Sequence, residues 1–238
     1  YKRQGIGHTV WKIAESKEVE IIKNAFAGIG EIYIADGHHR AASAVKVGLK
    51  RRKENHGYDG MEEFNYFLSV LFPDDQLMIM DYNRTVKDLN GLSEDEFIEK
   101  IKDNFEVTTL SEAKHPDKKG KVSMYLSGKW YMLSAKKELL EINDPVLSLD
   151  VSLLQNYLLE PVLGIKDPRT DERIDFIGGI RGLKELEKRA DSDMKVSFAM
   201  YPTSISELFD VADAGLLMPP KSTWFEPKLR SGLFIHRI

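Results

Sequence analysis

The stretch YIADGHHRAA (residues 33–42) is the part of the sequence that says most about the fold. Residues 31–35 are rich in apolar and β-branched side chains and predict a short strand, whereas residues 41–54 have the composition of a helix. Between them, Asp36 and Gly37 predict a sharp turn. Because the first N–H groups of a helix are unpaired and lie at the positive end of its dipole, a strand, turn and helix in this order predict a site for an anion.

The side chains of this turn add to that prediction. Gly37 allows the backbone to approach a ligand closely, and Arg40 can hold a phosphate with two donors. His38 and His39 supply further donors, and Asp36 can hold Mg²⁺ or accept a proton. The structural alternative is that Asp36 caps the helix and both histidines are surface residues.

A second candidate stretch, PPKSTWFEPKLRSG, spans residues 219–232. Its three prolines fix an irregular backbone, and its cations Lys221, Lys228 and Arg230 could complete a cationic wall around an anionic ligand. Its adjacent tryptophan and phenylalanine could stack on a base. The alternative is a C-terminal clasp with the aromatic rings in the core and the lysines in water.

A third stretch, residues 167–182, alternates acidic and basic residues and contains two adjacent glycines. It suits either a functional loop or a solvated network of ion pairs, with the ion pairs favoured. It resembles a phosphate loop only loosely, because it lacks the spacing and the Lys-Ser/Thr pair of that motif. Metal-ligand spacing is poor throughout: two adjacent helical histidines diverge by about 100° and cannot easily share one ion.

Composition limits the class of protein. The chain has 238 residues, of which 42% are hydrophobic and 30% charged, and these values are typical of globular proteins. It lacks cysteine, which excludes disulfides, thiolate metal sites and cysteine nucleophiles and is compatible with a cytoplasmic protein. A net charge of −4 argues against DNA as a partner, and no apolar run is long enough for a membrane helix. The chain begins with tyrosine, so we expect part of the N-terminal region to be missing.

The pattern of apolar residues predicts an α+β or α/β fold with mixed sheets. A capping box is predicted at Ser93 and Glu96, and a β-hairpin around the Ser127-Gly128 turn. The remaining expected helices are residues 17–26, 148–159, 182–190 and 205–214, and the remaining expected strands are residues 8–13, 64–72, 77–80, 174–177, 196–200 and 234–236. We expect a first domain at residues 1–90 and an α/β region at residues 91–238.

The pentapeptide at residues 36–40 resembles the phosphate-binding turn of the ParB/sulfiredoxin-like superfamily. The free-serine kinases that use ADP resemble it most, with an Asp-Gly-His-His-Arg type of motif. Nearly the whole chain also resembles one uncharacterised family, a domain of unknown function commonly described as Spo-zero-J/ParB-like. The supporting stretches are residues 35–40, 67–74, 144–150, 167–182 and 218–232. This resemblance implies a ParB/sulfiredoxin-like core followed by a C-terminal region.

The resemblance also implies roles for single residues. Gly37 and Arg40 match the phosphate-binding turn, and His39 matches a histidine of the sulfiredoxins and the kinase. Asp36 matches the kinase motif and is a candidate for Mg²⁺ binding or proton handling. His38 stands where sulfiredoxins have their catalytic cysteine, which excludes peroxiredoxin repair and leaves Asp36, His38 and His39 as candidate catalytic residues.

The sequence therefore predicts a nucleotide-binding protein that uses ADP, ATP or another nucleotide with Mg²⁺. The first hypothesis is a phosphotransferase that acts on a small hydroxylated metabolite, for which the resemblance suggests serine. The alternative is a non-enzymatic, ParB-like protein that is gated by a nucleotide. A nuclease is least favoured, since no cluster of carboxylates and histidines is evident in the sequence.

Overall fold

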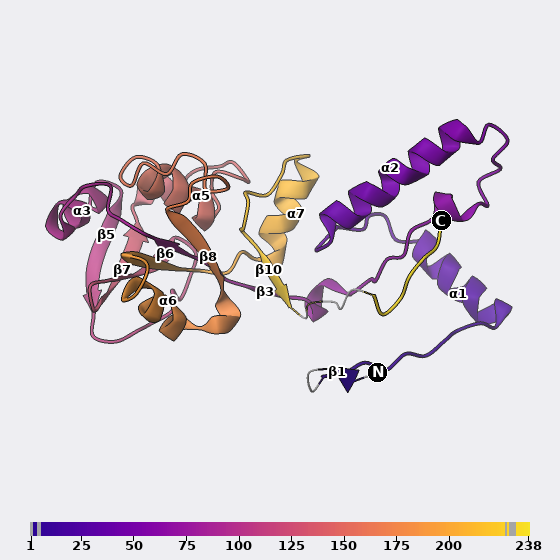
Figure 1. Cartoon of the computed structure of the whole chain (residues 1–238), viewed down its shortest axis with the longest axis horizontal. Coiled ribbons are helices and arrows are strands. Elements are labelled where there is room, and N and C mark those ends of the chain that lie inside the picture. Colours follow the sequence, from indigo (N-terminus) through magenta and orange to yellow (C-terminus); the bar gives the residue numbers. More distant parts are fainter. Residues whose placement is uncertain (1, 4–5, 227, 229–231) are drawn as a thin grey trace. The chain divides into compact units, whose positions relative to one another are not determined.

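A computed structural model of the chain describes residues 2–3, 6–226, 228 and 232–238 (Figure 1). The chain divides into two compact units, Tyr1–Gly37 and His38–Ile238. The predicted division at residue 90 differs from this boundary and stays a prediction. The helices are α1 (Ser16–Ala27), α2 (His38–Glu54), α3 (Glu94–Ile101), α4 (Lys137–Leu140), α5 (Asp150–Leu154), α6 (Leu183–Ala190) and α7 (Ile205–Asp213).

The strands are short, and each described pair of strands is antiparallel. This arrangement confirms the α+β alternative of the predicted fold class. The strands are β1 (Lys2–Arg3), β2 (Ile6–Gly7), β3 (Met78–Met80), β4 (Tyr82–Val86), β5 (Phe105–Leu110), β6 (Lys121–Leu126), β7 (Lys129–Ala135), β8 (Ile174–Gly178), β9 (Val196–Met200) and β10 (Trp224–Glu226). Short 3₁₀ turns are η1 (Glu63–Asn65), η2 (Asp74–Gln76) and η4 (Gly179–Arg181), and η3 (Gln155–Leu159) is a π-helical turn.

The first unit contains the β1–β2 pair and α1. The apolar residues of α1 recur at helical spacing, as the sequence predicts, but none of its side chains is buried. The predicted strands at residues 8–13 and 31–35 are wrong, because both segments lack regular secondary structure. A β-type sequence forms a strand only where a neighbouring strand takes up its backbone hydrogen bonds, and none is assigned beside these described residues.

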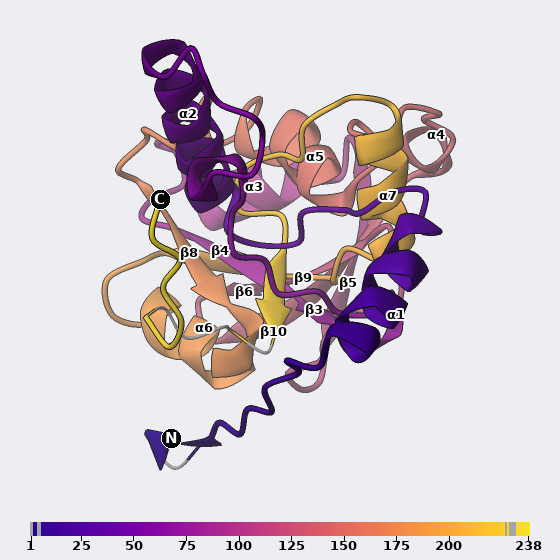
Figure 2. The same ribbon diagram turned by 90° about the vertical axis from the view of Figure 1, so that its right-hand side faces the viewer.

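The second unit is built on a six-stranded sheet with the order β5-β7-β6-β9-β4-β8. Residues alternate between its faces, so Val196, Phe198 and Met200 of β9 enter the main core while Ala199 enters a smaller one. Helices α3 and α5 contribute to the main core, and Leu186 of α6 to the smaller one. Figures 1 and 2 show α5 and α6 on opposite sides of the strands.

Local signals explain most of the elements of this unit. The capping box at Ser93 and Glu96 is confirmed, with both reciprocal hydrogen bonds present. The hairpin of β6 and β7 is confirmed, with Ser127 and Gly128 at positive φ in the turn. The expected helix at residues 148–159 is interrupted, since α5 passes into the π-helical turn η3.

Two further strand predictions are wrong. Residues 66–73 lack regular secondary structure after η1, and so do residues 235–238 beyond the bends at the end of the chain. The sequence analysis also missed β4 and β5, which together supply a central and an edge strand of the main sheet. Both have polar residues at positions that the period-2 pattern would make apolar.

Candidate functional site

The turn at residues 36–40 keeps two parts of the predicted geometry, the turn and the helix start, but the strand expected before it at residues 31–35 is absent. Gly37 has a φ of 85°, a backbone conformation that glycine adopts without steric cost, and α2 begins at the next residue. The Gly37 N–H donates a hydrogen bond of 2.8 Å to Oδ1 of Asp36. This hydrogen bond fixes the Asp36 carboxylate against the backbone of the turn.

The first turn of α2 carries His38, His39 and Arg40 and contains no acidic residue. These three side chains and that of Asp36 are exposed, and Gly37 is half-buried. The last turn of the same helix carries three basic residues, where the helix dipole favours them. The first turn departs from that rule, because a cation there faces the positive end of the dipole.

Two of the predicted cations lie in the C-terminal stretch, each over an aromatic ring. The Lys221 Nζ is 5.5 Å from the centroid of the Tyr82 ring, and the Lys228 Nζ is 5.1 Å from that of Trp224. Arg230 lies outside the described residues. The grouping of these cations with the turn at residues 36–40 stays a prediction.

Arg84, in the middle of β4, is a functional candidate that the sequence analysis missed. Its side chain is 4% exposed, and its guanidinium donates to the carbonyl oxygens of Tyr82 and Lys221. Burial lowers the pKa of Arg84 to about 10, although the neighbouring Tyr82 opposes this shift. The only signal in the sequence is an arginine between two polar residues, which does not by itself indicate a buried strand.

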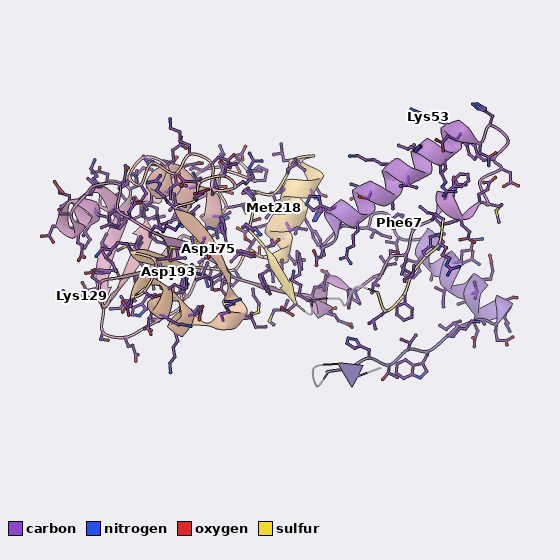
Figure 3. All side chains as sticks on the ribbon, viewed as in Figure 1. Lys53, Phe67, Lys129, Asp175, Asp193 and Met218 are labelled. Atoms are coloured by element: carbon purple, nitrogen blue, oxygen red, sulfur yellow. The ribbon has the colours of Figure 1, made fainter. Side chains whose placement is uncertain are left out.

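The third candidate stretch is a network of ion pairs, the alternative that the sequence favours. Arg173 bonds Asp171 and Asp88, and Arg189 of α6 bonds Asp175 and Asp193. Figure 3 shows Asp175 and Asp193 at the α6 side of the sheet. These arginines have their own carboxylates, so their charges are already compensated within the fold.

Two shallow grooves are present in the second unit. One, of about 350 Å³, lies between α3 and the neighbouring strands β5 and β7. The other, of about 410 Å³, lies between β3 and the loop before α7. None of the predicted site residues that the structure describes lines either groove. Among the described residues, no three histidine or acidic side chains are gathered as a metal site, and no helix has the length and apolar character needed to span a membrane.

Asp150 is a buried acid at the start of α5. Its Oδ1 accepts the N–H of Gly120 at 2.8 Å, and the side chain is 8% exposed. Burial raises its pKa to about 7; Glu207 adds to the rise, while the Gly120 N–H and Lys119 act in the opposite direction. Glu207 belongs to α7 and forms an ion pair with Lys119, with atoms 2.6 Å apart.

This pKa shift predicts how stability depends on pH. Between pH 4 and 7 the folded protein binds more protons at Asp150 than the unfolded chain does, so this residue lowers stability as the pH rises and its full cost is present above pH 7. Asp150→Asn is therefore expected to stabilise the protein by about 1–3 kcal/mol at pH 8 and by much less at pH 4.5. Urea unfolding at both pH values measures the difference; the exposed Asp103→Asn is the control and should show no such trend.

The second unit is therefore an α+β domain with a six-stranded antiparallel sheet, and a cationic helix start precedes that sheet in the sequence. The chain belongs to the family described as "Protein of unknown function (DUF1015)", whose model matches residues 1–152. No match was found among curated proteins.

Several solved structures are similar to the chain at low identity. A free serine kinase in complex with AMP is 17% identical with a TM-score of 0.43, covering 90% of this chain and 81% of that chain. A mutant free serine kinase in complex with ADP is 18% identical, with a TM-score of 0.41 and coverage of 90% and 81%. A conserved hypothetical protein from Pyrococcus furiosus is 16% identical, with a TM-score of 0.42 and coverage of 90% and 84%.

Proposed function

We propose that the turn at residues 36–40 binds the phosphates of a nucleotide, and that the protein transfers a phosphoryl group to a small hydroxylated metabolite. The observation that carries this proposal is the first turn of α2, where two histidines and an arginine stand and acidic residues are absent. A permanent cation in the first turn, such as Arg40, opposes the helix dipole by about 0.3–1 kcal/mol. A phosphate bound at this end of the helix would be attracted both by the helix dipole and by the guanidinium.

The backbone supports the same proposal. The positive φ of Gly37 turns the chain immediately before the helix, so the first N–H groups of α2 and the Arg40 side chain can address one ligand. The exposure of His38, His39 and Arg40 leaves them accessible to a nucleotide. Arg40 would hold two phosphate oxygens with its fork of donors, and an imidazole would donate to a third.

Asp36 would hold the Mg²⁺ that accompanies the nucleotide. Magnesium is usually bound by one or two carboxylates together with phosphate oxygens and water, so a single exposed carboxylate beside the phosphates is a suitable ligand. The Gly37 N–H bond to Oδ1 fixes the orientation of this carboxylate. Phosphoryl transfer depends mainly on position and charge neutralisation, which this set of groups would supply.

The phosphotransferase proposal is tested by nucleotide binding followed by transfer. ADP, ATP, CTP and GTP, each with Mg²⁺, are added to the protein and the melting temperature is measured, since a ligand of the folded state raises it. The nucleotide that binds is then incubated with serine and other small hydroxylated metabolites, and phosphorylated product is measured. Binding without any transfer would support the nucleotide-gated alternative, and absence of binding would refute both.

Asp36→Asn separates the two roles of the turn. The amide keeps the size of the side chain and an oxygen that can accept the Gly37 N–H, but it loses the charge that attracts Mg²⁺. We expect transfer to fall at least about 100-fold, while the affinity for the nucleotide without Mg²⁺ changes less than about 3-fold. Calorimetry with and without Mg²⁺ measures this. The exposed Asp59→Asn is the control; an Asp36→Asn variant that transfers at the wild-type rate would remove Asp36 from the mechanism.

A further inference from the structure

We propose that the Arg84 guanidinium and the Lys221 ammonium, which both contact Tyr82, form a binding site for the phosphate or carboxylate group of a small metabolite. This site belongs to the main sheet and the C-terminal stretch. It does not depend on the nucleotide-binding role proposed for the turn at residues 36–40.

The first observation is that the buried Arg84 has no carboxylate partner. Among the described residues, its guanidinium bonds only neutral groups, the carbonyl oxygen of Tyr82 and that of Lys221, the latter at 3.1 Å. The Phe176 ring lies beside it, with the guanidinium carbon 5.6 Å from the ring centroid. These contacts satisfy donors but leave the positive charge uncompensated, in a strand that is buried on both sides.

Arg84 can be compared with two other arginines of this unit whose positive charges are compensated by carboxylates. Arg173 and Arg189 are each bonded to two carboxylates, and in both cases these interactions raise the pKa of the guanidinium. Arg84 is more deeply buried than either, and its pKa moves in the opposite direction. An oxyanion is the group that would supply the missing charge.

The second observation is a second cation on the same tyrosine. The exposed Lys221 has a φ of 56°, an unusual conformation for a residue with a side chain, and its Nζ lies over the Tyr82 ring at 5.5 Å from the centroid. No carboxylate is paired with it among the described residues. Arg84 Nη1 donates to the backbone carbonyl oxygen of the same Tyr82, and Arg84 Nη2 donates to that of Lys221, so the two cationic residues are directly linked.

The loop that carries Lys221 is held in place at both sides. Ser222 is 5% exposed, its hydroxyl donates to the Pro219 carbonyl oxygen at 2.8 Å, and its own carbonyl oxygen accepts from Thr203 Oγ1 at 3.1 Å. Arg84 Nη2 donates to the Lys221 carbonyl oxygen at 3.1 Å. Residues in unfavourable backbone conformations that are held by several hydrogen bonds occur often in binding sites. There the conformation directs a side chain towards the ligand.

The surroundings define the class of ligand. Tyr82 and Trp224 are half-buried aromatic residues with ring centroids 5.3 Å apart, and they give the site an apolar wall. Glu226 is already bonded to Trp224 Nε1 at 2.8 Å and to the Lys228 N–H at 3.0 Å. The site therefore favours a small molecule with one oxyanion and a flat or apolar body.

Titration of the full chain with inorganic phosphate, and separately with benzoate, tests the site. The Nε–H signal of Arg84 is followed by NMR, and the affinity is measured by calorimetry. We expect a saturable shift for at least one of the two anions. Lys221→Ala and Arg84→Lys should each weaken that anion at least 10-fold, because the first removes a charge and the second removes the planar fork of donors. The exposed Lys184→Ala on α6 is the control and should bind as the wild type does.

The outcomes separate this site from the turn at residues 36–40. Arg40→Ala should leave the Arg84 signal and its titration unchanged, even if nucleotide binding is lost. If neither anion gives a saturable shift, or if Lys221→Ala binds as tightly as the wild type, the inference is overturned. Lys221 is exposed, so its truncation keeps the test valid even if Arg84→Lys fails to fold.

Discussion

Arg40→Ala is expected to weaken nucleotide binding by about 10- to 100-fold. A hydrogen bond to a charged group contributes about 1.5–3 kcal/mol, and we expect the solvent-exposed Arg40–phosphate contact to contribute about as much as one such bond. At about 1.4 kcal/mol for each factor of ten, the loss of this contact alone accounts for the predicted range. The variant also removes the one full, permanent charge from the first turn of α2. Calorimetry with the nucleotide identified by thermal shift measures the change.

Two further variants of α2 test whether the loss of affinity is specific to the Arg40 guanidinium. Arg51→Ala removes the same side chain from the last turn of the same helix, so it controls for a general loss of charge or helicity and should bind as the wild type does. Arg40→Lys keeps the charge but loses the fork, so its affinity should be intermediate. Unchanged affinity in Arg40→Ala would refute the proposed function, whatever the activity of the other variants.

The helices of this fold are predictable because their signals are local. The capping box at Ser93 lies within one helical turn, and the helical spacing of α1 is visible within twelve residues. The hairpin of β6 and β7 is predictable for the same reason, since its turn residues are adjacent in sequence. Signals of this kind do not depend on what the rest of the chain does.

The strands are less predictable because they depend on neighbours from elsewhere in the chain. Residues 8–13 and 31–35 have the composition of strands but lack regular structure, whereas β4 has a polar sequence and forms a central strand between β8 and β9. What makes β4 a strand is the set of partners supplied by residues about 90 to 110 positions further along. The amino-acid composition of β4 alone does not indicate that these partner strands are present.

The residues of the candidate sites also differ in whether the sequence alone can reveal them. The turn at Gly37 is visible in sequence, since a glycine before a helix start is a local feature. The buried charge of Arg84 is not, because the residues that surround it come from β8 and from the C-terminal stretch. A buried arginine without a carboxylate partner is therefore recognised only from the structure.

Gly179→Ala is expected to destabilise the second unit by about 2–4 kcal/mol, the larger of the predicted effects on stability. A Cβ at this position would lie 2.0 Å from Oδ1 of Asp81 and 2.4 Å from its Cγ, so the carboxylate must move. Asp81 cannot move freely, because it is 7% exposed and its Oδ2 accepts from Asn83 Nδ2 at 2.6 Å. The Asn83 Oδ1 in turn accepts the N–H of Met200 in β9, at 2.8 Å, which links the disturbance to the middle of the sheet.

A double-mutant cycle shows whether this steric conflict is the cause of the Gly179→Ala effect. Asp81→Ala removes all three atoms that the new Cβ would meet, so Gly179→Ala should cost less than about 1 kcal/mol in that background, and the two changes should be strongly non-additive. Urea unfolding of the four proteins measures the cycle. Gly57→Ala is the control, because its Cβ meets nothing within 4 Å. An additive cycle would mean that Gly179 is required for its backbone conformation and not for the close approach of Asp81.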